Sequence, residues 1–246
     1  MSLQTQLTSL RNGTNINDIE VPDALRNRWK IGMSFVDDLL DGGCVPSTTL
    51  FFTGAPGSGK STLFCQMADA ITKGGRSVLL NTGEESPFHV KMRCERLNLK
   101  HGFIVGQDTS LPKTLAHADE TGVDFLLVDS LQTFDDPQYE RSRGIAYQNS
   151  KTAERVLQEL SNWAKVKSRV VIAIGHVNKG GGFEGRNTLQ HMVDAHIDMT
   201  LDTRDKSDTF GYRLLRTVKN RFAPSGTELV LDMGSHGLHE ANSLKQ

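Results

Sequence analysis

The stretch GAPGSGKST at residues 54–62 carries the strongest structural signal in the sequence. It matches the pattern G-x-x-x-x-G-K-[ST] and lies between an apolar segment typical of a strand and a segment that predicts a helix. Glycines let the backbone wrap closely around phosphate oxygens, and the amino end of the helix adds partial positive charge. A glycine-rich turn with a chance lysine is the alternative, but every fixed position of the pattern is present. The stretch therefore predicts a nucleoside triphosphate site.

We expect the whole loop to hold the nucleotide: Gly54, Ala55, Pro56, Gly57, Ser58, Gly59, Lys60, Ser61 and Thr62. Lys60 should reach the β- and γ-phosphates and take part in catalysis, while the Ser61 hydroxyl should bind Mg²⁺. The metal also needs an acid, and FLLVDS at residues 125–130 ends a buried strand in Asp129. The expected cofactors are therefore ATP and Mg²⁺, with Ser61 and Asp129 as the metal-binding residues.

The composition restricts the class of protein. The chain has 246 residues, of which 37% are hydrophobic and 23% charged, and its formal net charge is −1. These values fit one large α/β domain and exclude a polycation. The apolar runs are far shorter than the roughly 20 residues of a membrane span, and the amino end lacks the apolar core of a signal peptide. Three scattered cysteines favour a reducing compartment. We therefore expect a cytoplasmic protein with no membrane partner.

Strand and helix signals alternate from Trp29 to about residue 240. Strands are predicted at residues 49–53, 77–81, 103–105, 124–129, 170–175, 195–201, 212–218 and 227–231, and helices at 61–73 and 152–167. Runs such as FLLV and VVIAI are continuously apolar, which is typical of parallel strands buried on both faces. The expected fold class is therefore α/β, with a mostly parallel central sheet flanked by helices in residues 29–246. Residues 1–28 are polar and predict an arm or cap.

Polar side chains follow two further predicted strands. Glu84 and Glu85 come after one strand and His176 after another. Open α/β sheets bind ligands at the carboxyl ends of their strands, where a carboxylate can act as a base or hold a water molecule. Plainer interpretations stay open. Ser86 and Pro87 can begin a helix, a position where acids are favoured, and a lone histidine is commonly a packing or surface residue.

Six segments occur in an order that resembles the ATPase core of bacterial RadA, also called Sms, within the RecA/KaiC superfamily. They are SFVDDLLDGGCVP, GAPGSGKSTLFCQMA, VLLNTGEESPFHVKMRCERL, LLVDSLQTF, GHVNKGGGFEGRNTLQHMVD and LLRTVKNRFAPSGTELVLDM. The resemblance covers residues 29–240 and implies a RecA-like P-loop NTPase core with antiparallel strands toward the carboxyl end. RadA proper adds a four-cysteine zinc finger and a Lon-protease-like domain, and neither occurs in this sequence. A branch-migration role is therefore in doubt, and a phage-encoded recombinase or a trimmed core also fits.

The resemblance implies roles for individual residues. Glu84 stands at the position of the RecA-type catalytic glutamate, with Glu85 beside it as in KaiC-like proteins. His176 stands where RecA has its nucleotide-sensing glutamine. Lys219 and Arg221 lie two residues apart at the end of a predicted strand, where extended backbone points them to the same side. Their segment is similar to the KNRFG motif of RadA, which implies that they meet the γ-phosphate bound by the next subunit. An exposed basic strand end is the alternative.

The resemblance also implies a partner. In RecA-like rings and filaments, two loops facing the central axis hold single-stranded DNA, and here these would be residues 134–150 and 178–188. The candidate DNA-binding residues are Arg141, Arg143, Lys179, Phe183 and Arg186. Arginine with an aromatic side chain suits backbone contact and base stacking. Acidic neighbours offset much of the charge, so solvated loops are the alternative.

We therefore expect a DNA-dependent ATPase in homologous recombination or repair. It should form a homo-oligomer, a hexameric ring or a filament, with ATP at the subunit interfaces, in the cytoplasm of a bacterial or phage-infected cell. A KaiC-like regulatory ring ATPase that binds proteins and a DnaB-like helicase motor are the alternatives. Stimulation of ATP hydrolysis by single-stranded DNA discriminates among them.

Overall fold

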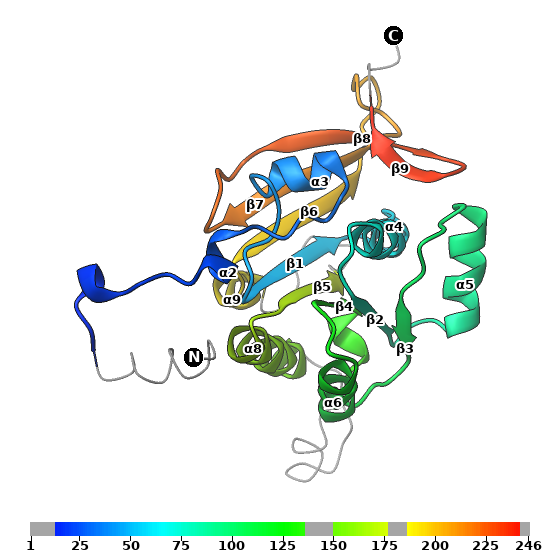
Figure 1. The fold of residues 1–246 in the computed structure, drawn as a ribbon. Helices are drawn as coiled ribbons and strands as arrows, with labels where there is room; N and C mark the ends of the chain where they lie inside the picture. Colours follow the sequence, from blue (N-terminus) through cyan, green and yellow to red (C-terminus); the bar gives the residue numbers. More distant parts are fainter. Residues whose placement is uncertain (1–12, 136–149, 177–185, 242–246) are drawn as a thin grey trace.

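A computed structural model describes residues 13–135, 150–176 and 186–241 of the chain. Among these residues, nine strands form one sheet in the order β3-β2-β4-β5-β1-β6-β7-β8-β9 (Figure 1). The strands are β1 Thr48–Gly54, β2 Val78–Thr82, β3 Ile104–Gly106, β4 Phe125–Asp129, β5 Val170–His176, β6 Ala195–Leu201, β7 Arg213–Asn220, β8 Glu228–Gly234 and β9 Gly237–Glu240. Neighbouring strands run parallel from β3 to β6 and antiparallel from β6 to β9. The predicted fold class is confirmed.

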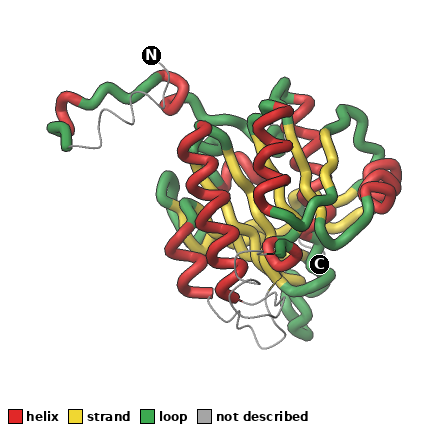
Figure 2. Tube along the Cα trace, turned by 90° about the horizontal axis from the view of Figure 1, so that it is seen from below, coloured by secondary structure: helices red, strands yellow, loops and turns green. Residues whose placement is uncertain are grey.

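Helices cover both faces of the sheet (Figure 1 and, seen from below, Figure 2). The helical segments are η2 Ile16–Asp18, α2 Asp23–Arg26, α3 Ser34–Leu39, α4 Lys60–Lys73, α5 Pro87–Arg96, α6 Leu111–Thr121, η3 Leu131–Thr133, α8 Ser150–Lys167 and α9 Arg186–Met192. Side chains of α3, α4 and α5 share one hydrophobic core, and those of α6, α8 and α9 share the other. Phe52 of β1 belongs to the first core and Phe51 to the second. A strand buried on both faces is therefore continuously apolar.

Two helices begin or run as the sequence predicts. Ser86 caps α5, its hydroxyl accepting a hydrogen bond from the backbone N–H of His89 at 3.3 Å, and Pro87 is the first helical residue. In α8 the predicted apolar stripe is buried. The indole of Trp163, at the edge of this stripe, donates a hydrogen bond to Asp119 of α6 at 2.9 Å. The amphipathic pattern of α8 therefore joins it to the sheet and to the neighbouring helix.

Some elements differ from the prediction. Every predicted strand occurs, with ends that differ by at most three residues, and residues 195–201 match β6 at both ends. The short strand β9 and the helices α3 and α6 carry no clear pattern in the sequence. The apolar face of α6 is interrupted by the buried hydroxyl residue Thr114, which weakens the signal of an amphipathic helix. The predicted loop at residues 178–188 is wrong at its end, because α9 begins at Arg186.

The amino-terminal segment extends away from the sheet before it joins the domain (Figures 1 and 2). The side chains of Ile16 and Val21 are exposed there. The segment meets the domain at Arg28, and Trp29 then pairs with Cys44 through two backbone hydrogen bonds. In the part of the chain that the structure describes, no helix has the length and apolarity to cross a bilayer.

Candidate nucleotide-binding and catalytic site

The phosphate-binding loop begins where β1 ends and leads directly into α4. Gly54 has a φ of 151°, and a Cβ atom there would lie 2.1 Å from the carbonyl oxygen of Met199 in β6. Gly59 has a φ of 113°, and a Cβ atom there would lie 2.9 Å from the side chain of Met233 in β8. Gly54 therefore requires glycine for backbone conformation and for space, whereas Gly59 requires it for backbone conformation, because the end of the Met233 side chain can move. The pattern that predicts phosphate binding also satisfies the local packing.

Lys60, the first residue of α4, lies inside this loop. Its Nζ donates hydrogen bonds to the carbonyls of Gly54 at 2.7 Å and Ala55 at 2.9 Å, and the residue is only 4% exposed. Burial lowers the pKa of Lys60, whereas the negative charges of Asp129 and Glu84 act to raise it. The ammonium group is thus held at the loop and within electrostatic reach of both acids.

Three of the predicted site positions meet at one edge of the sheet. Asp129 at the end of β4 pairs with Thr82 at the end of β2, and His176 at the end of β5 pairs with Gly54 at the end of β1. Because these strands are parallel neighbours, their carboxyl ends adjoin the phosphate loop. The structure describes only the backbone of His176, so the finding is the position of this residue in the strand register, opposite Gly54.

The two adjacent glutamates have different surroundings. Glu84 accepts a hydrogen bond from the Ser130 hydroxyl at 2.6 Å. Both carboxylate oxygens of Glu85 accept hydrogen bonds from Arg93 of α5, at 2.5 and 2.7 Å. Glu85 is therefore committed to an ion pair with α5, while Glu84 points to the end of β4. This arrangement favours Glu84 over Glu85 as the group that acts on water, a distinction that the resemblance implies but the residue pattern alone does not make.

The site fits ATP and Mg²⁺ by the chemistry of its groups. The loop offers backbone N–H groups at the start of a helix and a buried cation, which suit phosphate oxygens. Ser61 lies in the first turn of α4, and Asp129 is a buried carboxylate at the adjoining strand end. A hydroxyl and a carboxylate are oxygen ligands of the kind that Mg²⁺ prefers.

The sequence analysis does not predict a set of three hydrogen-bonded polar side chains next to the phosphate loop. The hydroxyl of Thr53 donates to Asp198 at 2.5 Å and therefore accepts from Nε2 of the fully buried His196 at 2.7 Å. These contacts join β1 to β6 one residue before the loop begins. The charge of Asp198 also acts to raise the pKa of Lys60. The available signal is the presence of polar residues inside two otherwise apolar strands, TLFFT and AHIDM.

Lys219 and Arg221 point to the same side, as predicted, but their partners belong to their own chain. Lys219 donates to three backbone carbonyls at the carboxyl end of α9, those of Gln190, His191 and Val193 at 2.8, 3.3 and 2.8 Å. Arg221 forms an ion pair with Asp194 at 2.8 Å. Cations are favoured beside the unpaired carbonyls of a helix end. In this structure the two cations therefore hold α9 in place.

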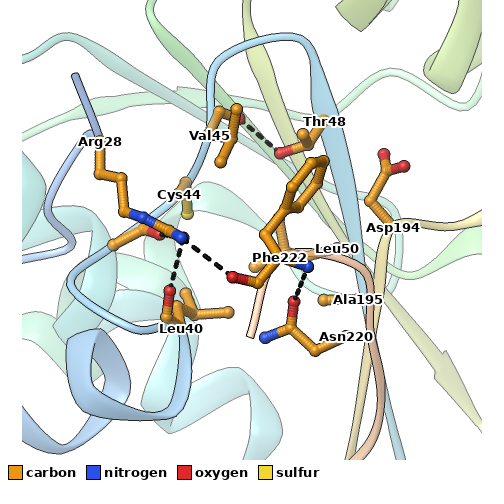
Figure 3. Close-up of a pocket in the computed structure, with 11 residues that line it drawn as sticks. Arg28, Leu40, Cys44, Val45, Thr48, Leu50, Asp194, Ala195, Asn220 and Phe222 are labelled. Carbon is orange, nitrogen blue, oxygen red and sulfur yellow. Dashed lines mark hydrogen bonds between the residues drawn. The ribbon is translucent and has the colours of Figure 1, made fainter. Parts of the chain in front are cut away.

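Both cations lie far from the phosphate loop of their own chain. Asp194 exchanges hydrogen bonds with Thr49, at the amino end of β1. The five residue steps from Thr49 to Gly54 span roughly 17 Å of strand. Figure 3 shows Asp194 in a pocket with Phe222, whose carbonyl accepts a hydrogen bond from Arg28 at 2.9 Å. The end of β7 is thus fixed at the amino edge of the sheet, away from the loop at the carboxyl edge.

The candidate DNA-binding residues lie mainly outside the described part of the chain. Arg141, Arg143, Lys179 and Phe183 are among the residues that the structure does not describe. Arg186 is the first residue of α9, and its backbone alone is described. Most of the second predicted loop lies between β5, which ends at His176, and α9, which begins at Arg186.

The chain is similar to known ATPase proteins. Residues 32–182 match the family model described as AAA domain. The chain is 34% identical over 222 residues to the DNA repair protein RadA of Streptococcus pneumoniae, covering 90% of this chain and 50% of that protein. It is 34% identical over 206 residues to RadA of Chlamydia muridarum, covering 83% and 43%. It thus spans about half the length of these curated relatives or less.

A solved structure supports the fold. The crystal structure of a KaiC-like protein from the archaeon Pyrococcus horikoshii OT3 superposes with a TM-score of 0.71, covering 87% of this chain and 99% of that one. The two sequences are 17% identical, so this likeness concerns the fold alone.

The anchoring role of Asp194 can be tested by stability. Asp194→Asn keeps the size of the side chain but removes the charge that pairs with Arg221 near the buried end of β1. We expect the free energy of unfolding in urea to fall by about 1–3 kcal/mol. Glu95→Gln breaks the exposed pair with Lys91 and should change it by less than about 0.5 kcal/mol. Equal values for the two variants would contradict the anchoring role.

Proposed function

This chain belongs to the AAA domain family, and on that premise we propose that it is a Mg²⁺-dependent ATP hydrolase that acts on single-stranded DNA in homologous recombination or repair. The observation that carries the hydrolase activity is the convergence of the phosphate loop, Asp129 and Glu84 at one sheet edge. Similarity to proteins named DNA repair protein RadA supports the role in repair. We further propose that residues 29–246 form the ATPase domain, preceded by the arm at residues 1–28, and that the protein is cytoplasmic.

In the proposed mechanism, Lys60 and the backbone of the loop bind the phosphates, and Ser61 and Asp129 hold the metal. Mg²⁺, when bound, neutralises charge on the phosphate oxygens. Glu84 orients the attacking water and accepts its proton, a role that suits a carboxylate held within reach of the loop. His176, paired in register with Gly54, senses the γ-phosphate.

We also propose that Lys219 and Arg221 act on ATP bound by a neighbouring subunit. Their position at the amino edge of the sheet keeps them from their own phosphate loop. A head-to-tail contact brings the amino edge of one copy to the carboxyl edge of the next and generates a ring or filament. At this subunit interface the two cations leave the α9 carbonyls and Asp194 and contact phosphate oxygens instead. Positive charge beside the γ-phosphoryl group raises the rate of its transfer by orders of magnitude.

Single-stranded DNA is the proposed partner of the two segments that contain Arg141, Arg143, Lys179, Phe183 and Arg186. A repeat of these segments around a ring or along a filament multiplies a small positive charge per subunit. Binding then depends on assembly and weakens as the salt concentration rises.

A KaiC-like regulatory ATPase that binds proteins is the second candidate. It is favoured by the net charge of −1 and by the acidic residues in the two predicted loops, Asp135, Asp136, Glu140 and Glu184. This function predicts ATP hydrolysis that single-stranded DNA does not change.

The hydrolase activity is tested by substitutions in the loop and at the acids. Lys60→Ala should weaken MgATP binding at least tenfold, because it removes a charge-assisted contact. Glu84→Gln should bind ATP within about threefold of the wild type and lower kcat by about 100-fold or more. Glu85→Gln, which weakens only the pair with Arg93, should lower kcat less, and Glu95→Gln is the exposed control. Equal losses for Glu84→Gln and Glu95→Gln would exclude the assigned base.

The action in trans is tested by mixing subunits. Arg221→Ala protein keeps Glu84, and Glu84→Gln protein keeps Arg221, so a co-assembled equimolar mixture should restore competent sites at about a quarter of the interfaces in a head-to-tail ring. The control mixture combines Glu84→Gln with Lys60→Ala; both defects lie in the ATP-holding subunit, so it should recover nothing. Steady-state phosphate release measures both mixtures. A first mixture as inactive as the second, with co-assembly demonstrated by native mass spectrometry, argues against the arrangement.

The DNA partner is tested by ATPase rates with and without a single-stranded oligonucleotide at low and physiological salt. We expect stimulation that is lost in the double variant Lys179→Ala/Arg186→Ala. The double variant Lys73→Ala/Lys100→Ala removes two exposed lysines elsewhere and should keep it. An absence of both binding and stimulation at low salt favours the regulatory ATPase instead.

A further inference from the structure

We infer that Ser130 is a positioning residue for hydrolysis, its hydroxyl holding the carboxylate of Glu84 in the orientation needed to act on water. The inference rests on the proposed role of Glu84 as the base. It is based on the contacts at the ends of β2 and β4, where Ser130 immediately follows Asp129.

The hydroxyl of Ser130 is buried and directed at a charged partner. Ser130 is 0% exposed, and its Oγ donates to Oε1 of Glu84 at 2.6 Å. A hydroxyl that donates to a carboxylate at this distance makes a charge-assisted hydrogen bond, which is stronger and more directional than one between neutral groups. The bond therefore restricts the rotation of a side chain that otherwise lies at the protein surface.

Ser130 is itself held in position. Its carbonyl accepts hydrogen bonds from the hydroxyl of Thr133 at 2.7 Å and from the backbone N–H of the same residue at 3.3 Å. These contacts close the short helical turn η3 directly after β4. The donor hydroxyl is therefore carried by a fixed turn.

A close approach of the two strand ends makes the contact possible. The backbone N–H of Gly83 donates to the carbonyl of Asp129 at 2.9 Å. A Cβ atom at Gly83 would lie 2.0 Å from Oγ1 of Thr133, so only glycine allows the backbone to come so near. Because β2 and β4 are then joined beyond their last paired residues, Glu84 emerges beside Ser130.

The residue after Glu84 is fixed as well. Glu85 is bound through both oxygens to Arg93, whose guanidinium also contacts the sulfur of Cys65 in α4 at 4.0 Å. The backbone that carries Glu84 is thus anchored to α5 on one side and to β4 on the other. With the backbone fixed, the Ser130 hydrogen bond acts on the orientation of the carboxylate itself.

The turn that follows β4 therefore supplies residues for two proposed roles. Asp129 is the proposed acid at the metal, and the next residue holds the proposed base. Orientation of a catalytic group relative to the reacting atoms contributes to the rate without contributing to ground-state binding. Ser130 should therefore affect kcat and leave the affinity for ATP almost unchanged.

The test is a steady-state comparison of variants. Ser130→Ala should lower kcat by about tenfold, the effect of one charge-assisted hydrogen bond, and change KM by less than about twofold. Ser130→Cys, of similar shape but with a weaker donor, should fall between Ser130→Ala and the wild type. Ser161→Ala is the matched control. It removes a buried hydroxyl that has no hydrogen-bond partner within the described residues, and it should leave kcat unchanged.

A double variant separates positioning from a structural role. On the Glu84→Gln background, Ser130→Ala should lower the residual kcat by less than about twofold, because the group that it orients is already impaired. A purely structural role predicts the same tenfold loss on both backgrounds, and that result overturns the inference. Should Ser130→Ala fail to fold, judged by its thermal melt, Ser130→Cys decides by the same comparison.

The outcomes distinguish this inference from the proposed function. A wild-type protein that does not hydrolyse ATP overturns both. A wild-type protein whose hydrolysis depends on Glu84, with Ser130→Ala at the wild-type kcat, overturns the positioning role and leaves the hydrolase activity standing.

Discussion

The parallel pairing of β1 with β5 on one side and β6 on the other fixes the position of the phosphate loop in the sheet. β1 is buried along its whole length and ends at Gly54, where the backbone of β6 leaves no room for a side chain. The phosphate loop can therefore begin only there. Through β5 and β4 the same parallel register extends to β2, so Asp129 and Glu84 arrive at the same edge as the loop. The order of the strands in the sheet, more than any contact between loops, therefore brings the residues of the candidate site together.

The sheet also holds two separate groups of charged side chains at its two edges. Lys60, Asp129 and Glu84 lie at the carboxyl edge, whereas Lys219 and Arg221 lie at the amino edge against α9 and Asp194. The side chain of Arg221 is 48% exposed, so water can solvate the guanidinium when it leaves Asp194. In the proposed exchange, a phosphate oxygen replaces the carboxylate as its partner. Arg221 can hold the end of β7 in one state and, as proposed, meet a phosphate in another.

Much of the fold and part of the site could be predicted from local patterns. The loop glycines, the apolar strands and the stripe of α8 each follow from backbone conformation or burial within one short segment. Asp129 could be placed because it ends such a strand. The two neighbouring glutamates could be distinguished only through the family resemblance, since both fit the start of a helix equally well. Thr53, His196 and Asp198 were missed because their contact joins two strands that are distant in sequence.

Local signals in the sequence predicted an α/β domain with a phosphate-binding loop, and the family resemblance added a RecA-like fold. The partner of each polar side chain became known from the tertiary structure alone. Ser130 and Glu84 are 46 positions apart, and Lys219 and Gln190 are 29 apart. Contacts over such separations depend on the order of the strands and on how closely their ends approach. No periodicity or motif encodes that geometry, since it arises from packing of the whole sheet.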